Sequence, residues 1–247
     1  MAETNPSFLN NAKVQQIIVQ YACRVPVRKE LNTSEKTALK NMLKEFDSAK
    51  FQIFDEPFQK NPMCLFQVQN QVPVGPNIIT LPSFIFANDS IIFFYPTKMV
   101  GKDVPAAGRV DGRDLNAKVL DWIFKVQNGI SNLSCQRSGK IFDIILGPVT
   151  PSDKAQMFKK LFSRSLDKVG EVTLSFADYH TEGAEIFNIG TTIRYVQQNL
   201  HDNFFVNLRV DINNRTMASA MEPRDVDKVW KFADAIIDTH LKEIIEI

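Results

Sequence analysis

Strict alternation of apolar and polar residues in two segments constrains this chain most. In "EVTLSFAD" (171–178) and "FFVNLRVDI" (204–212), apolar residues alternate with polar or charged ones, and the segment 185–197 between them follows a similar pattern. Successive side chains of a strand point to opposite faces, so each segment would place one face against a core and the other in water. We therefore expect an antiparallel sheet with helices on one face and water on the other.

The order of expected elements occurs twice along the chain. In the first series we predict a strand at 14–25, a helix from Ser34 after capping oxygens at 32–34, strands at 51–54, 63–69, 83–87 and 90–97, and a helix from 114. In the second series we predict a strand at 140–146, a helix from Ser152, strands at 171–178, 185–197 and 203–212, and a helix from Pro223. Loop-like residues at 128–139 separate the two series. The prediction is an α+β fold of two similar tandem halves, 1–132 and 133–247, each a mostly antiparallel sheet with helices on one face.

The last helix of each half begins with a similar motif. Arg113-Asp114 opens the first and Arg224-Asp225 the second, and a tryptophan follows on each apolar face. A diverged duplication would explain this similarity, and so would coincidence between two α+β halves. Asp111, Asp114 and Asn116 could also be oxygen ligands around a glycine turn, but capping and first-turn acids are a sufficient role for the aspartates.

Two apolar segments suggest more hydrophobic surface than one unit of helices on a sheet can bury. Both faces of the expected hairpin 84–95 are apolar, so it needs a cover on each side, from the same chain or from another subunit. Phe232 and Ile236 widen the apolar arc of the last helix beyond one core contact. We expect a homodimer whose interface includes part of one of these segments.

Composition and charge exclude several classes of protein. Hydrophobic residues at 44% and charged residues at 23% are typical of an ordinary globular protein, and a net charge of +1 gives no global attraction to nucleic acid, which is not expected as a partner. Three widely spaced cysteines predict reduced thiols and a cytoplasmic location. Neither a secretion signal nor a membrane-spanning segment is expected.

The cluster that most resembles catalytic chemistry is "DYHTEG" (178–183), which we place in the turn between two strands. His180 beside Tyr179 and Glu182 could transfer protons, although a hairpin loop needs similar residues. Arg194, Arg209 and Asp211 extend this candidate ligand site over the polar sheet face, whose alternative interpretation is a solvated surface.

Motifs for nucleotide folds and hydrolases are missing, and the histidines lack a metal-ligand spacing, so no cofactor or metal is predicted. The leading functional prediction is a binding or interaction protein without catalysis of its own. The alternative is an enzyme or small-ligand-binding protein with its site near 178–183 and the polar face. Neither prediction identifies the protein or small-molecule partner.

Overall fold

The computed structural model describes residues 7–46, 51–54, 64–74, 77–99, 112–161, 171–197 and 204–247. Its strands are β1 (Val14–Arg24), β2 (Phe51–Phe54), β3 (Cys64–Val74), β4 (Asn77–Ala87), β5 (Ser90–Met99), β6 (Arg137–Val149), β7 (Val172–Glu182), β8 (Glu185–Gln197) and β9 (Phe204–Asn214). Its helices are η1 (Phe8–Asn10), α1 (Thr33–Phe46), α2 (Gly112–Gly129), α3 (Pro151–Met157) and α4 (Pro223–Ile244). The α+β class is therefore confirmed.

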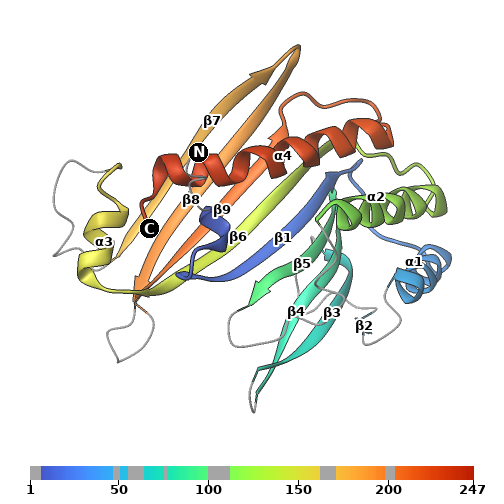
Figure 1. Ribbon diagram of the computed structural model, residues 1–247. Coiled ribbons are helices and arrows are strands. Elements are labelled where there is room, and N and C mark those ends of the chain that lie inside the picture. Colours follow the sequence, from blue (N-terminus) through green and yellow to red (C-terminus); the bar gives the residue numbers. More distant parts are fainter. Residues whose placement is uncertain are drawn as a thin grey trace.

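All nine strands lie in one sheet, in the order β2-β3-β4-β5-β1-β6-β9-β8-β7 (Figure 1). Every neighbouring pair is antiparallel. Counted outward from the centre, the first half places its strands as β1, β5, β4, β3 and β2, and the second half places its own as β6, β9, β8 and β7. The predicted boundary at 132/133 falls between α2 and β6, but the strands on either side of it share a sheet.

The central pair, β1 and β6, joins the two halves. Val19 is opposite Phe142 and Tyr21 is opposite Lys140 in their register. Because an antiparallel pair has a local two-fold axis between its strands, β5 beside β1 and β9 beside β6 occupy similar places around this axis.

Helices α2 and α4 cover one face of the sheet (Figure 1). Trp122 of α2 packs edge-on against Phe84 and Phe93, with ring centroids 4.8 and 4.7 Å apart, and Trp230 of α4 packs edge-on against Tyr21 at 4.9 Å. Both tryptophans are buried, so each apolar helix face predicted from the sequence contributes to the core.

A polar network lies in the core between both halves. Lys140 is 2% exposed, and its Nζ donates to both carboxylate oxygens of Asp234 at 2.6 Å and to Oδ1 of Asn116 at 2.8 Å. Tyr21 donates its hydroxyl to the same Asn116 oxygen at 2.9 Å. Burial lowers the pKa of Lys140, and Asp234 opposes that effect. The network links β1, β6, α2 and α4.

Several sequence predictions of helix ends agree with the structure. Asn32 and Glu35 cap α1 reciprocally: the Glu35 N–H donates to Asn32 Oδ1 at 2.9 Å, and the Asn32 N–H donates to Glu35 Oε2 at 3.0 Å. Pro223 stands at the start of α4, and Asp225 accepts the Glu222 N–H at 3.4 Å. Asp111 and the side chain of Asp114 lie outside the described parts.

Other boundaries differ from the predictions. The expected loop 128–139 is shorter, because α2 continues to Gly129 and β6 begins at Arg137. Strand β3 continues through Pro73. Helix α3 ends at Met157, and Phe158 and Leu161 follow it in turns. None of the described helices is both long and apolar enough to cross a bilayer.

The helices cover one face of the 84–95 hairpin, and the predicted cover of its other face, from this chain or from another subunit, stays a prediction. Phe84, Phe86, Ile91 and Phe93 are buried beneath the helices. Ile85, Ile92 and Phe94 point to the opposite face and stay half-buried. The wide apolar arc of α4, in contrast, is covered within the chain: Phe232 stacks on Phe187 at 3.9 Å, and η1 contacts α4 on another side.

Candidate functional site

The candidate site is the face of the sheet opposite α2 and α4, which we call the helix-free face. Because successive side chains of a strand point to opposite faces, the position of a residue along its strand determines whether its side chain lies on this face. Leu208 and Val210 of β9 are buried beneath α4, whereas Asn207 and Arg209 point the other way and are exposed. No described helix packs against this face.

The second half of the helix-free face is polar. Its exposed or half-buried polar side chains include amides, hydroxyls, three arginines and two aspartates: Thr173, Ser175, Asn188, Thr192, Asn207, Asn213, Arg137, Arg194, Arg209, Asp143 and Asp211. Ser175 and Thr192 share a hydrogen bond of 3.0 Å across β7 and β8, and Asn188 donates to Asn213 at 3.1 Å across β8 and β9. These contacts hold the side chains in an ordered array.

An ion pair lies near the middle of this face. Nη1 of Arg209 donates to the two oxygens of Asp143 at 3.0 and 3.2 Å, and Gln20 of β1 donates its amide to the same carboxylate. The side chains of Asp143 and Arg209 are 32% and 49% exposed, so solvent screens much of their attraction. The contacts with Asp143 therefore fix the orientation of Arg209 and Gln20 more than they stabilise the fold.

The first half of the helix-free face is apolar by comparison. Ile18 of β1, Ile85 of β4, and Ile92 and Phe94 of β5 are half-buried there, and Ile145 of β6 continues the surface toward the centre. A contiguous apolar surface beside a polar one is typical of a binding surface. The face therefore has two chemically different regions.

A shallow hollow of about 250 Å³ opens on the helix-free face at one end of the central strands. Arg24 and Arg137 line it, and Gly139 is part of its lining. A Cβ on Gly139 would lie 2.6 Å from Cβ of Asn213 and 2.7 Å from the Ile212 carbonyl oxygen, so only glycine lets β6 and β9 approach this closely. The same lack of a side chain helps to keep the hollow open.

The predicted turn at 178–183 is largely strand. Residues up to Glu182 belong to β7, and only Gly183 and Ala184 form the turn. Gly183 has φ +62°, the left-handed conformation that a two-residue hairpin needs at its first central position. Strand alternation therefore separates the residues that were expected to act together.

His180 and Tyr179 point to opposite faces of β7. His180 is exposed on the helix side, with its ring 5.0 Å from that of Phe232. Tyr179 is 62% exposed on the helix-free face, beneath the guanidinium of Arg215 at 4.6 Å. Glu182 is exposed at the end of β7, on the same side as His180 by alternation.

The remaining predicted site residues lie on the helix-free face. Arg194, Arg209 and Asp211 come from β8 and β9, and Asp211 accepts a hydrogen bond from Asn213 at 2.8 Å. These three share the face with Tyr179, whereas His180 and Glu182 do not. The six residues therefore do not form one constellation.

Sequence reasoning missed the buried histidine. His240 of α4 is 7% exposed, and its Nε2 shares a hydrogen bond of 2.8 Å with Thr191. Burial lowers the pKa of His240, while Asp178 and Glu243 oppose that effect. Its place on the apolar stripe of α4 was the available signal. The contact is structural.

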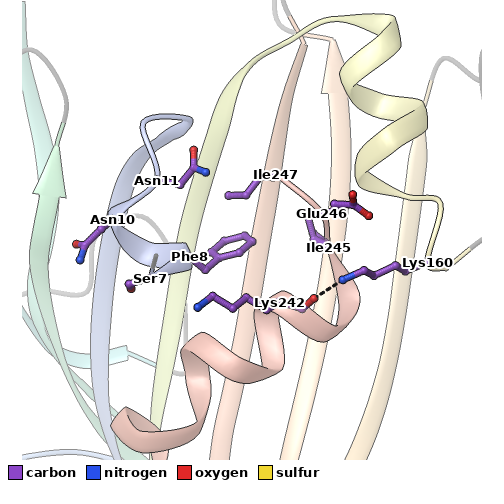
Figure 2. A pocket seen from close by; sticks show the side chains of 9 residues that line it. All are labelled: Ser7, Phe8, Asn10, Asn11, Lys160, Lys242, Ile245, Glu246 and Ile247. Carbon is purple, nitrogen blue, oxygen red and sulfur yellow. Dashed lines mark hydrogen bonds between the residues drawn. The ribbon is translucent and has the colours of Figure 1, made fainter. Parts of the chain in front are cut away.

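A second cavity, of about 430 Å³, lies at the C-terminal end of α4 (Figure 2). Phe8, Ile245 and Ile247 supply apolar walls, and Lys160 donates to the Lys242 carbonyl at 2.6 Å. That lysine satisfies a terminal carbonyl of the helix and complements its dipole. The cavity lies where η1, the residues after α3, and α4 meet.

Among the described residues, no group of three or more histidine, cysteine or acidic side chains is placed to hold a metal ion. No protein-family model matches the chain, and no curated protein matches it. One solved structure that matches is the di-domain ARO/CYC StfQ from the steffimycin biosynthetic pathway. The two are 8% identical, with 90% of this chain and 94% of that chain covered, and a TM-score of 0.21. That score carries no argument about function.

Proposed function

We propose that this chain is a binding protein that holds a nucleic-acid duplex against the helix-free face of its sheet. The observation that carries the proposal is a sheet face on which no described helix packs and whose described side chains include ordered amides, hydroxyls and arginines beside an apolar region. Size, chemistry and symmetry each support this occupant.

The dimensions of the face suit a duplex. Nine strands about 4.8 Å apart give a width of about 38 Å, which is the length of about 11 base pairs. Except for the short β2, the strands have about 11 residues and are about 36 Å long, so the face covers at most about 1,400 Å². Specific protein–DNA interfaces bury about 1,000–2,500 Å² of protein surface.

The side chains suit the minor groove. Base edges in that groove present mainly acceptors, which amide and hydroxyl groups such as those of Asn207 and Thr192 can satisfy. Proteins that bind there also place apolar side chains against the bases and sugars, as Phe94 and Ile145 could do. A strand surface that combines both types has the composition this groove requires.

The local symmetry of the central strands supports the same partner. A duplex has two-fold axes perpendicular to its length, and proteins with a matching axis can contact both strands in the same way. The antiparallel pair of β1 and β6 provides such an axis at the centre of the face. We propose that the two halves are diverged copies, since they place their strands in the same order from the centre.

The sequence prediction that nucleic acid is not a partner depended on the net charge of +1. Net charge determines long-range attraction, whereas contact depends on which groups lie on the binding face. Arg194 is exposed there and forms no ion pair with a described residue. Affinity would come from shape and hydrogen bonds, with a small number of phosphate contacts.

The test is fluorescence anisotropy with labelled 16-base-pair duplexes, one A·T-rich and one G·C-rich. Asn207→Glu adds a negative charge to the helix-free face, and Ala117→Glu adds the same charge to an exposed position on α2. We expect Asn207→Glu to weaken duplex binding by about tenfold or more, the effect of about one lost base contact, and Ala117→Glu to leave it unchanged.

Absence of binding to either duplex, or equal effects of the two variants, would overturn the proposal. Sedimentation of the wild type distinguishes the main competing occupant, a second copy of the chain, which the half-buried Ile92 and Phe94 would favour. A dimer that Asn207→Glu or Ile145→Glu dissociates would assign the face to self-association. The small-ligand alternative requires His180, so loss of ligand binding in a His180→Ala variant would favour it.

A further inference from the structure

Two arginines are directly opposite each other on the central strands. Arg24 of β1 and Arg137 of β6 are register partners, and both point to the helix-free face. Cα atoms of such partners lie about 4.5–5.5 Å apart, and like charges in this arrangement repel. A cross-strand arginine pair at one end of the central strands therefore favours binding of an anion.

Neighbouring groups hold Arg137 in place without neutralising it. Its Nε donates to the Asn214 carbonyl at 2.8 Å, and Nη2 donates to Oδ1 of Asn213. Both acceptors are neutral, and no described carboxylate lies within the 4.0 Å of an ion pair to Arg137. Three of its five N–H donors remain after these two bonds.

Two acidic groups also line the hollow, and one of them contacts Arg24. Asp89 lies 3.8 Å from Arg24, a long contact between side chains that are 36% and 47% exposed. Asp211 accepts the amide of Asn213 at 2.8 Å. These carboxylates reduce the positive potential of the hollow, but neither one forms an ion pair with Arg137.

We propose that Arg24 and Arg137 bind one phosphate group in the hollow of about 250 Å³ that they line. Arginine presents a planar fork that fits phosphate oxygens, and Asn213 holds that of Arg137 in position. The Gly139 position leaves room for the anion. This inference rests on the proposed function, according to which the bound phosphate belongs to a phosphodiester of the nucleic-acid backbone. A free phosphate is the other source of the same chemistry.

The first experiment measures duplex affinity against KCl concentration for the wild type, Arg24→Gln, Arg137→Gln and the control Arg224→Gln. Arg224 is on α4 with its side chain 81% exposed, away from the hollow. Loss of one phosphate contact lowers the slope of log affinity against log salt by about 1. We expect that change for both hollow variants and no change for Arg224→Gln.

The second experiment uses inorganic phosphate alone and records the thermal midpoint of unfolding at constant ionic strength. Phosphate should raise the midpoint of the wild type and of Arg224→Gln, and the rise should be lost in Arg137→Gln. Chloride replaces phosphate in the control series. A purely structural arginine would not produce an anion-specific shift.

The two experiments separate failure of the subsite from failure of the proposed function. If duplex binds but Arg137→Gln keeps the wild-type salt slope and phosphate response, the subsite is wrong and the duplex function stands. If no duplex binds, the phosphate series alone decides: a midpoint shift that Arg137→Gln abolishes supports the subsite, and its absence overturns it.

Discussion

The two faces of the sheet differ most clearly along β6, where two adjacent isoleucines lie in different environments. Ile144 is 1% exposed beneath the helices, whereas Ile145 is half-buried on the helix-free face beside Asn207. The side chain of Lys140 is 2% exposed and pairs with Asp234, which is itself 42% exposed, whereas both side chains of the Asp143–Arg209 pair are in contact with water. The helix-covered face therefore contributes more to stability than the helix-free face.

The largest expected effect compares Ile144→Ala with Ile145→Ala. Ile144→Ala should lower the free energy of unfolding by about 4 kcal/mol, because it leaves a cavity in a closely packed core. Ile145→Ala should cost less than about 1.5 kcal/mol, because its side chain already contacts solvent. Urea titration measures both. Equal losses would mean that the helix-free face is packed as tightly as the core.

The next effect compares charged pairs on the two faces. Asp234→Ala removes the carboxylate partner of the buried Lys140 and should cost about 3 kcal/mol, because an unpaired charge remains in the core. Asp143→Ala leaves Arg209 in contact with water and should cost less than about 1 kcal/mol.

A double variant tests the cause of the Asp234 effect. Lys140→Met with Asp234→Ala should recover most of the lost stability in urea unfolding, because no buried charge then remains. If the double variant is as unstable as Asp234→Ala, packing around Lys140, and not its charge, accounts for the loss.

The smallest effect concerns the two described histidines. Because the pKa of His240 is lower in the folded protein than the unfolded value near 6.5, the folded state binds fewer protons. Its stabilising contribution is present above pH 6.5 and is lost as the pH falls through the folded pKa.

Unfolding measured from pH 7 to pH 5 should show less than about 1 kcal/mol of this loss, given partial solvent screening. His240→Gln should remove that part of the pH dependence. His180→Gln, at the exposed position on β7, should leave it unchanged. An identical pH profile for the wild type and His240→Gln would contradict the assignment.

Local patterns predicted the elements well. The apolar stripe through Val226, Val229 and Trp230 predicted α4, and the alternation in 204–212 predicted which side of β9 is buried. Both are properties of nearby residues, which the period of a helix or strand determines directly. The polar half of the helix-free face was predictable for the same reason.

Long-range pairing was not predictable in this way. Val19 and Phe142 are opposite each other, but nothing in either segment specifies the other as its partner. The hairpin at 84–95 is an example: both of its faces are apolar in sequence, and only the packed sheet shows which face lies beneath the helices and that Ile92 and Phe94 are half-buried on the other. The arginine pair also depends on that register, so no local motif marks it.

The central position of β1 has a consequence for synthesis of the chain. β1 is made first among the strands, yet its second neighbour, β6, begins at Arg137 and ends at Val149. Until that stretch leaves the ribosome, β1 is an edge strand with an unpaired row of backbone donors and acceptors. In the nascent chain the most exposed pairing edge is therefore that of β1, which lies in the middle of the finished sheet. Chaperone contact with β1 during translation would protect the chain best.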